Sequence, residues 1–142
     1  LMSLRVEKGY GSWGRDYSPE YWPQESGLAR LVKPDKEFLN KAAWEAISAK
    51  APREMITFLE IDAKDADASG GEPIFLPDGT PAGQVSSGAY GYFVRKSLAI
   101  AYLKAGIAKP GDEVNVAILG KPHTARVLGA SAFDPEGKRL RG

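Results

Sequence analysis

The 142-residue sequence contains no cysteine and only one histidine, His123. Without cysteine the chain has neither a disulfide framework nor a thiolate metal site, and a lone histidine cannot form a zinc site of several imidazoles. The run DADASG at residues 65–70 matches the first half of a calcium-binding EF loop, but Leu76 stands where that loop needs a bidentate carboxylate. We therefore predict no metal site, and His123, which has no catalytic partner, is not a candidate general base.

An excess of charge of one sign and a long apolar run are also missing. Nineteen basic and eighteen acidic side chains leave a net charge of +1, so no overall field attracts nucleic acid or anionic lipid, and we exclude both as partners. No stretch of about 18 apolar residues and no signal-peptide pattern exists, which argues against a membrane span. We expect a bacterial cytoplasmic or mitochondrial matrix protein. Since the first residue is Leu1 and not Met, we also expect a fragment of a longer protein.

The region from Gly83 to Leu103 organises the second half of the chain. It predicts two neighbouring strands, at 84–92 and 97–103, and the second is apolar enough to run through an interior. Hydrophobic periodicity changes from 3.6 to 2 after Arg53, which predicts the first strand of this unit. Further short strands between tight turns are expected at 74–76, 113–119 and 123–128. The sequence thus predicts a mainly β domain, a six-stranded antiparallel barrel of jelly-roll or Greek-key character.

A small α/β remnant is expected before this barrel, over residues 1–52. Residues 1–8 read as the last turns of a helix with Gly9 as its C′ residue, and 9–27 as an ordered loop rich in aromatic rings. Residues 28–33 suggest a short strand, and an apolar stripe predicts a helix from 38 to 50. The chain after residue 134 is expected to be a solvated tail.

The best candidate site in the sequence combines Glu7 with Tyr10 and Trp13. On a plain structural interpretation, Glu7 and the neighbouring Arg5 and Lys8 are ordinary surface charges at a helix end. The nearby rings favour binding instead, because a carboxylate accepts two adjacent N–H groups of a flat heterocycle in parallel while aromatic side chains cover its faces. Two glycine clusters, 9–11 and 88–91, are better explained by turns or bulges than by phosphate binding.

Several segments resemble the C-terminal portion of the glycine-cleavage T-protein family of aminomethyltransferases. They are SLRVEKGYGSWGRDYSP at 3–19, PQESGLARLVKPDKEF at 23–38, the long run at 70–103, PGDEVNVAILGKPHTARV at 110–127 and FDPEGKRLR at 133–141. The pattern EKGY-x-x-WG-x-D-x-S-P is similar to the branch fused behind flavin domains in dimethylglycine and sarcosine dehydrogenases.

The resemblance implies that residues 1–52 end a central folate-binding α/β domain and that 53–142 form the C-terminal barrel. Glu7 matches the glutamate that hydrogen-bonds the pterin ring of tetrahydrofolate, and we place Tyr10 and Trp13 with it as cofactor-binding residues. The catalytic aspartate is expected upstream of Leu1, so no catalytic residue is assigned here and the fragment alone should be inactive. Upstream folate-binding domains, a further flavin domain and a small N-methyl amine substrate are the implied partners.

Three departures from the family pattern leave the amine substrate open. Arg95 replaces the usual small residue before Lys96, and Trp22 and Gln24 flank Pro23 where the family has threonine and leucine. Two functions remain open as well. In the first, the parent protein is an enzyme that transfers a one-carbon unit to tetrahydrofolate. In the second, the segment is a non-catalytic structural or partner-docking barrel, because fold alone does not fix function.

Overall fold

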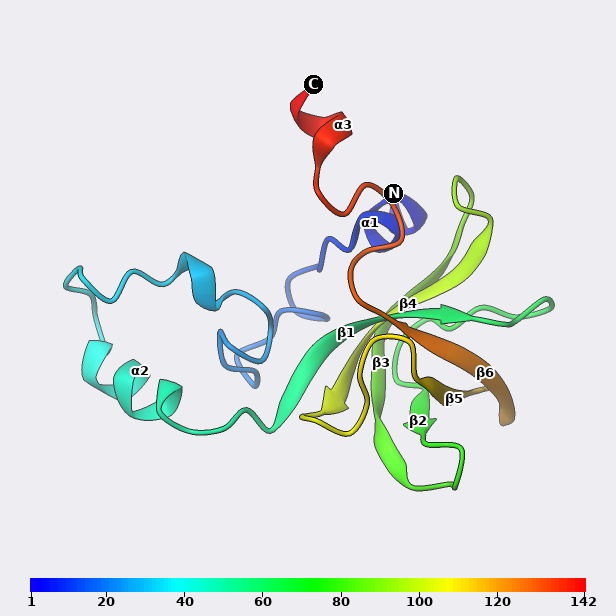
Figure 1. Cartoon of the computed structure of the whole chain (residues 1–142), viewed down its shortest axis with the longest axis horizontal. Coiled ribbons are helices and arrows are strands. Elements are labelled where there is room, and N and C mark those ends of the chain that lie inside the picture. The colour runs from blue at the N-terminus through cyan, green and yellow to red at the C-terminus, as the bar shows by residue number, and fades with distance from the viewer.

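The computed structural model describes all residues 1–142, and its centre is a closed antiparallel barrel of six strands (Figure 1). The strand order is β1-β4-β3-β2-β5-β6, in which β2, β3 and β4 are consecutive neighbours and β1 lies beside β4 in a Greek-key arrangement. The predicted barrel is confirmed. The strands are β1 (Glu54–Ile61), β2 (Pro73–Phe75), β3 (Pro81–Gly91), β4 (Lys96–Lys104), β5 (Glu113–Ile118) and β6 (Lys121–Leu128).

Strand β4 is buried on both faces, as its nearly continuous apolar sequence predicts. Ala99, Ala101 and Leu103 belong to the main core inside the barrel. The alternate residues Leu98 and Ile100 point outward and form a second, smaller core. Because both faces are covered, all seven residues between Lys96 and Lys104 are buried.

The outer face of β4 is covered by α1 (Met2–Lys8), whose Val6 completes the smaller core with Leu98 and Ile100. Gly9 ends this helix in the left-handed conformation, with φ 71°, and its N–H bonds to the carbonyl of Val6. The predicted helix end and its glycine cap are therefore confirmed. The position of α1 matters because it carries Glu7 onto the barrel.

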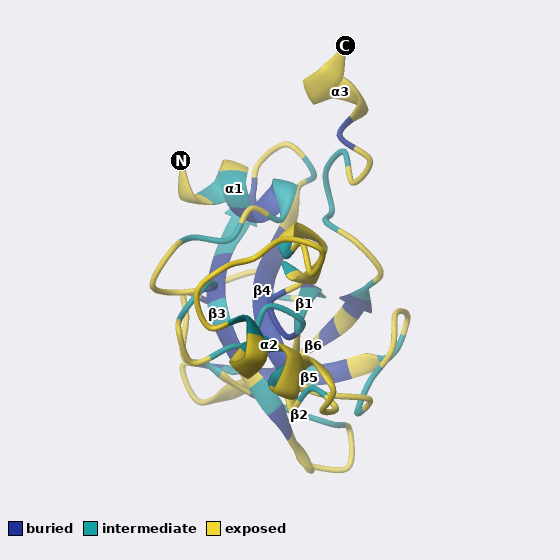
Figure 2. Cartoon of the chain, turned by 90° about the vertical axis from the view of Figure 1, so that its left-hand side faces the viewer, coloured by how far each residue is buried: buried dark blue, intermediate teal, exposed yellow.

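The segment between α1 and β1 holds two short helices, the 3₁₀ helix η1 (Ala29–Leu31) and α2 (Lys41–Ser48). The strand predicted at 28–33 is wrong, because a closed barrel has no free edge with which such a strand could pair. Helix α2 begins later than predicted, since Asn40 adopts a left-handed backbone with φ 63° that interrupts the helical path. None of its residues is buried (Figure 2), and it lies away from the barrel (Figure 1).

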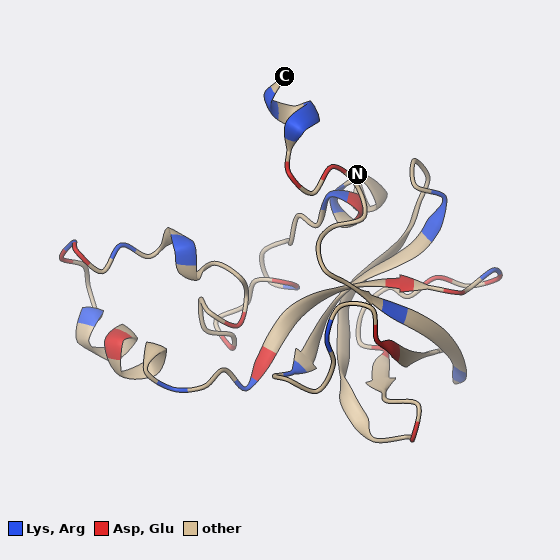
Figure 3. Ribbon diagram, in the orientation of Figure 1, with Lys and Arg blue, Asp and Glu red and all other residues tan.

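Beyond β6 the chain returns to α1 and ends in a four-residue helix, α3 (Lys138–Arg141). Lys8 forms an ion pair with Asp134 at 3.1 Å, which ties this return to α1. The tail is exposed and basic (Figure 3), although its short helix is not expected from the sequence. None of the helices has the length and apolar character that a membrane crossing requires.

Candidate functional site

A mainly apolar groove of about 470 Å³ lies between α1 and the C-terminal segment. Its lining includes Glu7 and Tyr10, which the sequence predicts as site residues, and Phe93, which belongs to the turn between β3 and β4. The C-terminal segment contributes Phe133 and Arg139. Three parts of the chain that are far apart in sequence therefore form one site.

Glu7 is the buried acidic group of this groove, with only 2% of its surface exposed. Its Oε1 accepts the backbone N–H of Phe93 at 2.7 Å and that of Val94 at 3.2 Å. No protein donor reaches Oε2. This oxygen is also not fully enclosed, because Ser97 Oγ is the only fully enclosed side-chain polar atom without a hydrogen-bond partner. Oε2 is therefore an open acceptor at the edge of the groove, and Glu7 is not the ordinary surface charge of the plain interpretation.

Aromatic rings and cations form the walls around this carboxylate. The rings of Phe93 and Phe133 pack edge to face with centroids 4.7 Å apart. The guanidinium carbon of Arg139 lies 5.4 Å from the ring centroid of Phe93 and 5.5 Å from that of Phe133. Tyr10 is half exposed, with Lys8 Nζ 5.8 Å from its ring centroid. Such a pocket suits a flat ligand with an apolar body and a polar edge.

Trp13 does not join this group. It is 81% exposed and does not line the groove, so its role in cofactor binding stays a prediction. Conversely, sequence reasoning missed Phe93, Phe133 and Arg139 as groove residues. The string at 133–141, one of the segments that resemble the family, was a signal for the last two, but nothing local in the sequence places them beside Glu7.

Asp16 anchors the loop after α1 in a buried polar network. Its carboxylate accepts Arg5 Nη1 at 2.8 Å and Ser87 Oγ at 3.0 Å, while its carbonyl accepts the Tyr102 hydroxyl at 2.6 Å. Burial by itself would raise the pKa of Asp16, but hydrogen bonds from serines and the charge of Arg5 together hold this pKa below its usual value. The network fixes α1, and thus Glu7, against β3 and β4.

Glu25 anchors the same loop at a second point. It is fully buried and accepts two side-chain hydrogen bonds from Arg53, whose guanidinium lies 4.6 Å from the ring of Trp22. The hydrogen bonds from Arg53 lower the pKa of Glu25 to about 2. Next to it, the rings of Tyr21 and Tyr102 stack with centroids 3.5 Å apart. The aromatic loop at 9–27 is therefore packed on the barrel.

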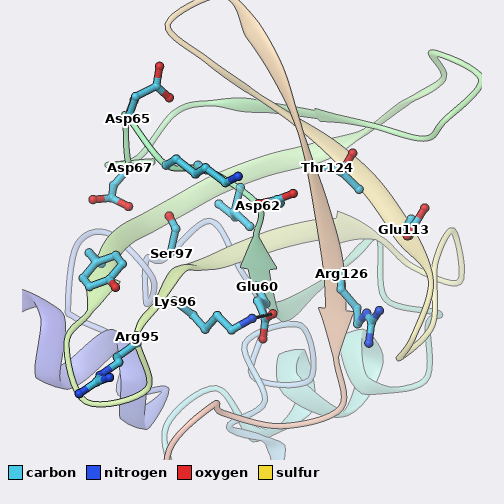
Figure 4. A pocket seen from close by; sticks show the side chains of 15 residues that line it. Glu60, Asp62, Asp65, Asp67, Arg95, Lys96, Ser97, Glu113, Thr124 and Arg126 are labelled. Atoms are coloured by element: carbon cyan, nitrogen blue, oxygen red, sulfur yellow. Dashed lines mark hydrogen bonds and ion pairs between the residues drawn. The ribbon is translucent and has the colours of Figure 1, made fainter.

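A second cavity, of about 990 Å³, opens at one end of the barrel (Figure 4). Its walls mix acidic and basic side chains, with Lys96 paired to Glu60 at 2.7 Å, and Ser97 Oγ lies buried there without a partner. No three or more His, Cys, Asp or Glu side chains of the chain are grouped to hold a metal ion. Because charged groups line this cavity, it suits a flat heterocycle less well than the groove does. None of the site residues predicted from the sequence lines it.

Comparison with known proteins agrees with this architecture. Residues 53–134 match the family model described as the Glycine cleavage T-protein C-terminal barrel domain. The chain is 34% identical over 130 residues to mitochondrial dimethylglycine dehydrogenase of Homo sapiens, covering 90% of the chain but 15% of that protein. It is 30% identical over 151 residues to mitochondrial sarcosine dehydrogenase of Mus musculus, covering 100% of the chain and 16% of that protein.

A solved structure shows the same fold. The glycine cleavage system aminomethyltransferase T from Bartonella henselae superposes with a TM-score of 0.83 at 24% identity, over 94% of this chain and 38% of that one. The present chain thus corresponds to a small part of much longer relatives. Its matched region, 53–134, begins one residue before β1 and ends after β6, so it contains the whole barrel. This chain belongs to the glycine-cleavage T-protein family and contains its C-terminal barrel domain.

Proposed function

We propose that this chain is the C-terminal part of a tetrahydrofolate-dependent aminomethyltransferase module. In the complete protein, which we infer to resemble dimethylglycine or sarcosine dehydrogenase, the module moves a one-carbon unit from an N-methyl amine to tetrahydrofolate. Relatives named aminomethyltransferase support the transfer reaction, and the relatives named dimethylglycine and sarcosine dehydrogenase support an N-methyl amine as substrate. The observation that carries the proposal is the carboxylate of Glu7, which offers an open oxygen at the edge of a ring-lined groove.

The groove fits the pterin end of folate in two respects. Glu7 Oε2 has no protein donor, so it is free to accept N–H groups from the polar edge of the ring. Phe93, Phe133 and Tyr10 provide apolar surface for its faces. In this proposal the chain's own residues bind and orient the cofactor and exclude water, while the general acid or base and any flavin belong to other domains.

The alternative, a non-catalytic docking barrel, also has an observation in its favour. Glu7 Oε1 already accepts two backbone N–H groups of the β3–β4 turn, so the residue has a structural role even without a ligand. If that role were its whole purpose, the groove would be a packing surface for neighbouring domains. The two functions therefore differ in whether Glu7 contributes to folate affinity.

The experiment is Glu7→Gln in the full-length protein, with folate affinity measured by calorimetry. Glutamine keeps an oxygen that can bond to the turn, but its amide group replaces the open acceptor and opposes the N–H donors of the pterin. We expect affinity to fall by roughly 2 to 4 kcal/mol, from one lost charge-assisted bond and one unpaired donor. Glu37→Gln, at an exposed position far from the groove, is the matched control. Unchanged affinity in Glu7→Gln would support the docking barrel.

A second arm uses the present chain by itself. A pterin must be enclosed on both faces and along its polar edge, and most of that enclosure is expected from upstream domains. We therefore expect the isolated chain to bind tetrahydrofolate more weakly than about 10 µM. Binding tighter than about 10 µM would show that the groove is a complete site, contrary to the proposal.

A further inference from the structure

We propose that the β3–β4 turn, residues 92–95, positions the carboxylate of Glu7 so that one oxygen alone, Oε2, receives the donors of a ligand. This inference rests on the proposed function and deepens it, because it assigns separate roles to the two oxygens of one residue. It also identifies Gly91 and the backbone of Phe93 and Val94 as positioning elements of the site.

The first step is the double hydrogen bond to Oε1. Two consecutive backbone N–H groups, of Phe93 and Val94, point at this oxygen from 2.7 and 3.2 Å. A carboxylate oxygen has two lone pairs, so both acceptor positions of Oε1 are in use. Because the donors belong to the backbone and not to a mobile side chain, they fix the plane of the carboxylate.

The second step is the space that Gly91 leaves for Glu7. A Cβ built on Gly91 would lie 2.8 Å from both Cγ and Oε1 of Glu7, closer than nonbonded heavy atoms tolerate. Gly91 is not among the residues with positive φ, so its backbone conformation does not require glycine. The absence of a side chain is needed here for the close approach of the carboxylate.

The β3–β4 turn holds the acceptor and the groove wall together. Arg95 adopts φ 58° and its N–H bonds to the carbonyl of Gly91 at 2.7 Å, which closes the turn. Phe93 then contributes its N–H to Oε1 and its ring to the groove wall. One short turn thus sets both the acceptor and the apolar surface beside it.

The occupied Oε1 changes how the carboxylate would receive a ligand. From the sequence, a flat heterocycle would place its two adjacent N–H groups one on each carboxylate oxygen. With Oε1 occupied by the turn, both ligand donors converge on Oε2 instead. The acceptor is therefore directional, and small displacements of the turn are expected to weaken binding.

The test is Gly91→Ala in the full-length protein, with Gly129→Ala as the matched control. A Cβ at Gly129 meets only ordinary contacts, with Pro110 at 3.6 Å, and lies outside the groove. We expect Gly91→Ala to weaken folate binding about tenfold or more, the effect of misplacing one hydrogen bond to a charged group. Gly129→Ala should leave affinity unchanged. In the present chain, the amide-proton resonances of Phe93 and Val94 should shift in Gly91→Ala but not in Gly129→Ala.

If Gly91→Ala does not fold, Glu7→Asp takes its place. This change keeps the charge but shortens the side chain by one methylene, so it cannot reach the turn and the ligand together, and the same loss of affinity is expected. Unchanged affinity in the folded variant, while Glu7→Gln still weakens binding, would overturn the positioning role and leave the proposed function standing. Unchanged affinity in Glu7→Gln would remove both.

Discussion

Arg53 holds the buried carboxylate of Glu25 with two parallel hydrogen bonds, from Nε to Oε1 at 2.9 Å and from Nη2 to Oε2 at 2.7 Å. The pair links the aromatic loop to the residue that precedes β1. It therefore crosses the domain boundary that we predict between residues 52 and 53. Two sides of an inferred boundary are here joined by a bidentate ion pair, which is the strongest geometry that these two groups offer.

This pair predicts a loss of stability in acid. The folded-state pKa of Glu25 is about 2, against an ordinary value of 4.5, so its contribution is complete above about pH 5 and is lost as pH falls toward 2. We expect roughly 2 kcal/mol, less than the full shift implies, because Arg53 is 55% exposed and solvent screens the pair. Urea unfolding of wild type and Glu25→Gln between pH 7 and pH 2 measures the difference. A constant difference across that range would contradict the prediction.

Asp16→Asn is expected to destabilise the fold strongly. Asparagine keeps the shape but replaces a charged acceptor with an amide that opposes Arg5 or the serines, so buried donors lose their partner. Breaking such a buried pair costs about 3 to 5 kcal/mol. Chemical denaturation measures the loss. Removing the exposed pair of Lys41 and Glu37 by Glu37→Gln should leave stability unchanged, and an equally small effect of Asp16→Asn would rule out an anchoring role for the network.

Ser97→Ala should be neutral or stabilising. The hydroxyl of Ser97 is buried without a hydrogen-bond partner, so removing it relieves a desolvation cost of about 1 to 3 kcal/mol. Ser87→Ala is the matched control, since Ser87 Oγ bonds to both Arg5 and Asp16 and its loss should destabilise. The melting temperature should fall in Ser87→Ala and should stay unchanged or rise in Ser97→Ala. A clear destabilisation by Ser97→Ala would mean that a solvent molecule or ligand satisfies this hydroxyl.

Hydrogen exchange should divide the segment before the barrel into two parts. Amides of α1 and of the loop around Asp16 are expected to be protected, because Val6 and Asp16 are packed on the barrel. Amides of α2 should exchange fast, since none of its residues is buried. Mass spectrometry of peptides after timed labelling resolves these regions. Equal protection of α2 and β4 would show that another surface covers α2.

The sequence alone determined the barrel. Alternation of apolar residues is a local property with a period of two, so the six strands are recognised without knowledge of their partners. The run at 97–103 even predicts burial on both faces, which Val6 and the barrel interior provide. The strand predicted at 28–33 was wrong because pairing depends on a free sheet edge, and a closed barrel leaves none.

The burial and hydrogen bonds of Glu7 follow from long-range contacts of the folded chain. In the sequence it is one charge among several at a helix end, and only the nearby aromatic residues and the resemblance to a known family indicate its importance. The groove forms because the β3–β4 turn and the C-terminal segment, more than 80 residues away, meet α1. Hydrogen bonds between such distant segments follow from the closure of the barrel, and no local pattern of residues encodes them.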